Sequence, residues 1–164
     1  MFELIPLRIF ISVQSGRQHL LAYNPRGEVF KCLRLDYITA VELSSPCERF
    51  DELRASLDVM QKNMWGVGYR EKRQALEHIE FTVYVSPSED YIISRLEREK
   101  RIGTVEQLDS RHYRFSADVY NSEELIPWIR TFICRIVDIN FSKKSLETQF
   151  KRDIERMHAM YDLE

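Results

Sequence analysis

Residues 4–43 constrain the fold more than any other stretch, because they hold four apolar runs of strand length. The runs are rich in β-branched and aromatic residues, which favour strands. In the break at Asn24-Pro25-Arg26-Gly27, Pro25 presets its φ angle and Gly27 can adopt a positive φ, so we expect a hairpin turn. The pattern predicts an antiparallel meander that forms part of a small β-barrel, with strands at residues 9–13, 19–23, 29–35 and 38–43.

The second half of the chain has a different pattern. Residues 79–85 alternate apolar and polar side chains with the period of a half-buried strand. The segments that follow read helix, strand, strand, helix and strand, which completes the βαββαβ plan of a ferredoxin-like domain. One more helix is expected with Ser142 as its N-terminal cap, and its apolar stripe is Leu146, Phe150, Ile154, Met157 and Tyr161.

Between these halves, residues 49–64 are helix formers with turn-forming residues on both sides. We therefore expect an α+β protein with three parts. They are a small β-sheet domain at residues 1–45, a linker with a helix at residues 46–72, and the ferredoxin-like domain at residues 73–164.

Composition limits the possible functions. The chain has 164 residues and a formal net charge of −2, so no global field would draw it onto DNA or an anionic membrane. Residues 4–43 nevertheless hold five Lys or Arg against three Asp or Glu, so an anion-binding patch would be local. No apolar run approaches the roughly 20 residues needed to span a bilayer. Three widely spaced cysteines without a CxxC motif indicate reduced thiols, so we expect a cytoplasmic protein.

No catalytic or metal-binding pattern stands out in the sequence. The four histidines fall at unrelated spacings and form no His-x-x-x-His pair. Neither a glycine-rich phosphate loop nor a nucleophile elbow occurs. Cys32 and Cys134 are expected to pack in the core. We therefore expect a protein that is not an enzyme and needs no metal or cofactor.

Three short motifs follow one another in the first half: Pro6-Leu7-Arg8, residues 15–23 (SGRQHLLAY) and residues 33–38 (LRLDYI). Together they resemble the WYL domain of bacterial transcriptional regulators. Residues 128–138 and 146–161 are similar to the C-terminal extension domain that usually follows it. Gln18-His19-Leu20 stands in place of the name-giving Trp-Tyr-Leu, and Tyr37 stands where the family commonly has a second arginine.

The resemblance implies an Sm/SH3-like barrel that senses a ligand, often a nucleotide or nucleic acid, in a regulator whose N-terminal helix-turn-helix binds DNA. Because the sequence begins inside the expected barrel, we expect the sensor part of a longer regulator or a shortened reading frame. A barrel without its first strands exposes a strand edge, and the last helix has an apolar side. A homodimer is therefore expected.

The resemblance also implies a ligand site on the small sheet. Arg17 and Arg34 match the family's basic positions, and a guanidinium suits phosphate oxygens; the alternative is that both are ordinary solvated arginines. His19 could stack on a base or donate to a phosphate, or be a half-buried structural histidine. Ser12 and Ser15 could add hydroxyl contacts, and Arg8 completes the candidate set.

The sequence thus predicts a non-enzymatic effector-sensing and oligomerisation module that binds an anionic nucleotide or nucleic acid through these arginines. Two alternatives stay open. The ferredoxin-like sheet could bind single-stranded nucleic acid through Tyr113 and Phe115, although core packing explains these aromatics better. The chain could also be a purely structural dimerisation domain.

Overall fold

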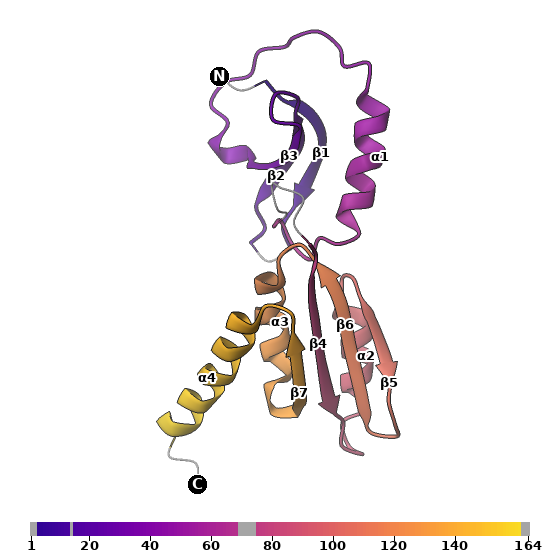
Figure 1. Cartoon of the computed structure of the whole chain (residues 1–164), viewed down its shortest axis with the longest axis vertical. Helices are drawn as coiled ribbons and strands as arrows, with labels where there is room; N and C mark the ends of the chain where they lie inside the picture. Colours follow the sequence, from indigo (N-terminus) through magenta and orange to yellow (C-terminus); the bar gives the residue numbers. More distant parts are fainter. Residues whose placement is uncertain (1–2, 14, 69–74, 162–164) are drawn as a thin grey trace. The chain divides into compact units, whose positions relative to one another are not determined.

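The computed structural model describes residues 3–13, 15–68 and 75–161. The chain divides into two compact units, Met1–Ala75 and Leu76–Glu164, each of which has its own sheet (Figure 1). The described residues form two antiparallel sheets, of three and four strands, and four α-helices, so the protein is of mixed α+β class. None of the helices in these residues is both long enough and apolar enough to cross a membrane.

The sheet of the first unit has the strand order β1-β2-β3. The turn between the first two strands uses Gly16 at a φ of 67°, and its N–H donates to the Ser12 carbonyl at 2.7 Å. In the next turn the left-handed residue is Glu28, with a φ of 50°, so the positive φ expected at Gly27 lies one residue later. The strands are β1 (Ile5–Ile11), β2 (Gln18–Asn24) and β3 (Val29–Arg34).

The fourth expected strand, at residues 38–43, does not form. The chain leaves the sheet after β3 through a 3₁₀ turn, η1 (Leu35–Tyr37), and Leu43 is 97% exposed. The prediction was wrong because an apolar run becomes a strand only where a neighbouring strand can pair with its backbone. Helix α1 (Phe50–Gln61), which we expected in the linker, lies within the first unit and buries Leu53 and Leu57.

The sheet of the second unit has the order β5-β6-β4-β7, and all neighbouring strands are antiparallel. Helix α2 (Tyr91–Glu99) connects β4 to β5. The connection from β6 to β7, expected as one helix, is divided into η2 (Ser122–Leu125), α3 (Ile126–Ile129) and η3 (Arg130–Arg135). The strands are β4 (Glu77–Tyr84), β5 (Thr104–Gln107), β6 (His112–Val119) and β7 (Ile136–Phe141).

Aromatic side chains fill the space between this sheet and its helices. The Phe81 ring lies 5.3 Å from that of Phe115 and 5.8 Å from that of Trp128, centroid to centroid. Figure 1 shows α2 and α3 on the same side of the sheet, where Arg95 of α2 donates to the Thr131 hydroxyl at 2.7 Å. Phe115 is fully buried, so the core interpretation of this residue is confirmed.

Helix α4 (Lys144–Met160) is only half covered. Leu146 and Phe150 of its apolar stripe are buried, whereas Met157 and Tyr161 are 41% and 67% exposed. The expected cap was wrong: the Ser142 hydroxyl accepts a hydrogen bond from the backbone N–H of His78 at 2.9 Å, so it is used to join β4 to the end of β7.

Candidate functional site

The structure brings three of the predicted site residues to one end of the first sheet. Arg17 ends the turn before β2, His19 lies near the start of β2, and Arg34 ends β3. His19 and Arg34 are direct partners in the β2–β3 register, so their side chains lie on the same face of the sheet. Arg17 is exposed, and its guanidinium has no hydrogen bond or ion pair within the described residues.

Arg34 is held by residues that follow it immediately in the chain. Its Nε donates to Asp36 Oδ1 at 3.0 Å, its Nη2 donates to Asp36 Oδ2, and its Nη1 donates to the Tyr37 hydroxyl at 2.8 Å. The guanidinium carbon also lies 4.0 Å from the centre of the Tyr37 ring. The turn η1 makes this geometry possible, because it folds residues 35–37 back toward the end of β3. Arg34 therefore already binds an anionic group, namely a carboxylate.

The charges of both arginines act on Asp36. Hydrogen bonds from Arg34 lower the pKa of this carboxyl below its ordinary value, and the charge of Arg17 lowers it further. The same hydrogen bonds raise the pKa of Arg34. Arg17, Arg34 and Asp36 thus form one electrostatic group, which we call the arginine cluster. Its formal charge is +1, from two cations and one anion.

Two of the remaining predicted residues shape the turn next to this cluster. Ser12 is buried, and its hydroxyl accepts from the backbone N–H of Ser15 at 3.4 Å. The Ser15 hydroxyl accepts from the backbone N–H of Arg17 at 3.4 Å. The two serines therefore position the backbone that carries Arg17.

His19 and Arg8 are engaged inside the first unit. His19 is only 7% exposed, and its Nδ1 lies 3.1 Å from the Arg17 carbonyl, so its ring is not open for stacking on a base. The Arg8 side chain binds helix α1: Nη2 donates to Asp58 at 2.7 Å and Nη1 donates to Gln61. Arg8 thus joins β1 to α1 and does not contribute to the arginine cluster.

Sequence reasoning missed Asp36 and the role of Tyr37. A signal was available, because a carboxylate two residues after an arginine at a strand end can fold back onto it when a tight turn follows. The residue type at position 37 gave the second signal, since a tyrosine combines a hydroxyl acceptor with a ring that attracts guanidinium.

The arrangement suits anion binding. Among the described residues no group of three or more His, Cys, Asp and Glu side chains could hold a metal ion. Cys134, expected in the core, is exposed, because it lies near the end of η3 where the chain turns toward β7. Two guanidinium groups at one sheet end provide donors for phosphate or carboxylate oxygens, and Asp36 accepts from one of them.

Comparisons with known proteins add no family. No protein-family model matches the chain, and none of the curated proteins matches its sequence significantly.

Proposed function

We propose that the chain is the effector-sensing and oligomerisation module of a WYL-type transcriptional regulator, and that it binds an anionic nucleotide or nucleic acid without catalysing a reaction. The order β5-β6-β4-β7, with helical connections after β4 and β6, supports a ferredoxin-like second domain. The three-stranded sheet would be the described part of an Sm/SH3-like barrel.

One observation carries the ligand site: the Arg34 guanidinium already holds a carboxylate through two hydrogen bonds, at the sheet end where Arg17 also lies. Asp36 would occupy the place of a ligand anion on Arg34 when no ligand is bound. A phosphate group could replace it, because it offers the same bidentate pattern of oxygens and carries more charge. Arg17, whose guanidinium is exposed, would then add a second contact that Asp36 does not saturate.

The test is binding of short single-stranded oligonucleotides and cyclic dinucleotides at two salt concentrations. Arg17→Ala and Arg34→Ala should each weaken binding about tenfold or more, since a hydrogen bond to a charged group contributes roughly 1.5–3 kcal/mol. Arg49→Ala is the matched control. Arg49 is also an exposed arginine of the first unit with a bidentate carboxylate partner, Glu52, but it lies outside the arginine cluster.

Two outcomes would count against this proposal. Equal binding by wild type and all three variants would remove the arginines from the mechanism. No binding by wild type would leave structural dimerisation as the better function. The other alternative, base stacking on the second sheet, has no support from Phe115, which is fully buried between that sheet and its helices.

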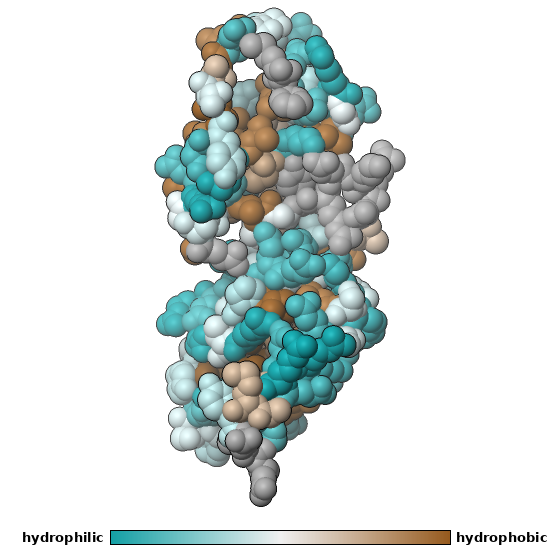
Figure 2. Space-filling model, turned by 90° about the vertical axis from the view of Figure 1, so that its left-hand side faces the viewer, coloured by the Kyte–Doolittle hydropathy of each residue, from teal (hydrophilic) through white to brown (hydrophobic). Residues whose placement is uncertain are grey.

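Self-association follows from the apolar surface that the chain leaves open. Figure 2 shows brown, apolar atoms at the surface of the first unit. Ile9 and Ile11 on β1 are 63% and 58% exposed, and β1 is an edge strand of its sheet. We propose that a second copy of the chain covers this surface. Light scattering at tens of micromolar, about the range of weak interfaces, should show a dimer, and a clean monomer would contradict the proposal.

A further inference from the structure

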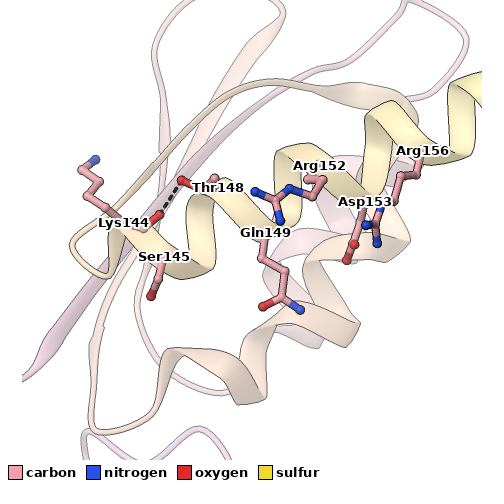
Figure 3. A pocket seen from close by; sticks show the side chains of 7 residues that line it. All are labelled: Lys144, Ser145, Thr148, Gln149, Arg152, Asp153 and Arg156. Carbon is pink, nitrogen blue, oxygen red and sulfur yellow. Dashed lines mark hydrogen bonds between the residues drawn. The ribbon is translucent and has the colours of Figure 1, made fainter.

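One flank of α4 presents a row of polar and cationic side chains to solvent. Lys144, Thr148, Arg152 and Arg156 recur every four residues, which places them about one turn apart along the same flank. Ser145, Gln149 and Asp153 form the neighbouring row, and the seven residues line a hollow of about 620 Å³ (Figure 3). Because one helix supplies all of these residues, the hollow is open on its other side.

Two cations of this hollow are available for a ligand. Arg152 and Arg156 are exposed and have no hydrogen bond or ion pair within the part of the chain that the structure describes. This state is unusual in the second unit, where ten other Lys and Arg residues pair with a carboxylate. Each free guanidinium offers five N–H donors in a planar arrangement that matches phosphate oxygens.

Two of the three acidic side chains in residues 144–156 are paired with cations, and the third, Glu155, is exposed. Asp153 lines the hollow, but its carboxylate accepts from Arg130 of η3. Glu147, one turn after Lys144, accepts from Lys144 at 2.8 Å and from Lys151 at 2.7 Å. With Arg130, which pairs with Asp153, residues 144–156 then carry a formal charge of +2, from five cations and three anions.

The shape and chemistry of the flank favour an extended polyanion. From Lys144 to Arg156 the row rises about 18 Å, at about 1.5 Å per residue, which is longer than a single phosphate group needs. No aromatic side chain lines the hollow, so it offers no platform for base stacking. No apolar side chain lines it either, whereas a membrane-binding helix sets apolar residues beside its cations. Hydroxyl, amide and guanidinium groups are the side chains that contact nucleic-acid phosphates.

We infer that this flank of α4 binds the phosphate backbone of a nucleic acid without reading its bases. The inference does not rest on the arginine cluster, which lies in the other unit. The affinity of this flank for nucleic acid would be low and would fall steeply with salt concentration, because each phosphate contact releases condensed counterions.

The test is fluorescence anisotropy of the full chain with a labelled 20-base-pair duplex over a series of salt concentrations. The double variant Arg152→Ala/Arg156→Ala should weaken binding at least tenfold at low salt. It should also reduce the slope of log K against log salt by about 2, one for each lost phosphate contact. The control variant Arg98→Ala/Lys151→Ala removes the same charge from exposed positions outside the hollow and should keep most of the affinity and slope.

Further measurements distinguish binding at this flank from binding at the arginine cluster and from binding of other polyanions. A second duplex of unrelated sequence should bind equally. The double variant Arg152→Ala/Arg156→Ala should bind a cyclic dinucleotide like wild type, so that failure here is distinguishable from failure at the arginine cluster. Circular dichroism verifies that each variant is folded. The inference is overturned by an equal loss in the control variant, by absence of binding to the duplex, or by stronger binding to polyglutamate or to anionic phosphatidylserine vesicles than to nucleic acid.

Discussion

The two units cover their sheets to different degrees. In the second unit one face of the sheet is sealed by helices, and Phe81, Phe115 and Phe132 are each at most 1% exposed. In the first unit Ile9, Ile11 and Val13 are more than half exposed, and both outer strands of the sheet have an open edge in the described residues. Burial of apolar surface is the main favourable term in folding. We therefore expect the second unit to be the more stable scaffold and the first to need a ligand or partner for full stability.

The largest expected effect comes from opening the sealed core. Phe81→Ala should lower the free energy of unfolding by about 3–5 kcal/mol, because the cavity would lie among the rings of Phe115, Trp128 and Phe132. Ile9→Ala, in the first unit, should change it by less than about 0.5 kcal/mol. Urea unfolding of both variants measures the contrast, and equal losses would show that the two sheets are covered alike.

A glycine in each unit gives a second, smaller contrast. Gly103 has a φ of 88°, and an added Cβ would lie 2.5 Å from the backbone carbonyl of Ser116, so Gly103→Ala should cost about 2–4 kcal/mol. Gly16 also has a positive φ, of 67°, but an added Cβ meets nothing within 4 Å. Gly16→Ala should therefore cost only about 1–2 kcal/mol, from the left-handed backbone alone. Thermal unfolding shows which variant loses more stability. A larger loss in Gly16→Ala than in Gly103→Ala would contradict the close packing at Gly103.

A third prediction concerns pH. Hydrogen bonds from Lys144, Lys151 and the backbone N–H of Phe141 lower the pKa of Glu147 to about 2. Because this pKa is depressed on folding, its contribution is complete above the unfolded value of about 4.3 and is lost as the pH falls toward 2. We expect a loss on the order of 1–2 kcal/mol over this range. Glu147→Gln should lack that part of the pH dependence in chemical unfolding from pH 5 to pH 2, and an unchanged profile would contradict the assignment.

The sequence predicted the second unit better than the first for a physical reason. The alternation in residues 79–85 predicted β4, because a strand sealed on one face shows period 2 directly. The run at residues 38–43 had comparable apolar content but no pairing strand, and nothing local reveals a missing neighbour. The sequence also did not predict that the segment between β6 and β7 is divided into η2, α3 and η3. One signal was available, because Pro127, which lacks an N–H donor, stands at the start of α3.

The sequence predicted the cations of the candidate site but not the residues that pair with them. Positions 17 and 34 were found from their motifs, and the strand register brings Arg34 opposite His19. The occupation of Arg34 by Asp36 depends on the turn η1, of which only Leu35 was assigned to a strand. The expectation of a further strand at residues 38–43, directly after this turn, therefore concealed the main interaction of the site.

The smallest expected change in stability belongs to the open surface of β1. Ile9→Lys/Ile11→Lys should alter the free energy of unfolding of the isolated chain by less than about 1 kcal/mol, since both side chains are mostly solvated. The same change should abolish self-association, because it places two charges on the apolar surface that we assign to the interface. Sedimentation at several concentrations measures the effect, and a dimer of unchanged affinity would exclude this strand from the interface.

The most direct test of the account is anion binding by Asp36→Asn. If Asp36 occupies the ligand position on Arg34, its removal raises the formal charge of the arginine cluster from +1 to +2 and frees a bidentate guanidinium. Calorimetric titration with a cyclic dinucleotide should then show binding about threefold to tenfold tighter than wild type, with the gain reduced at high salt. Equal or weaker binding by Asp36→Asn would contradict the account, because Asp36 would then not compete for the site.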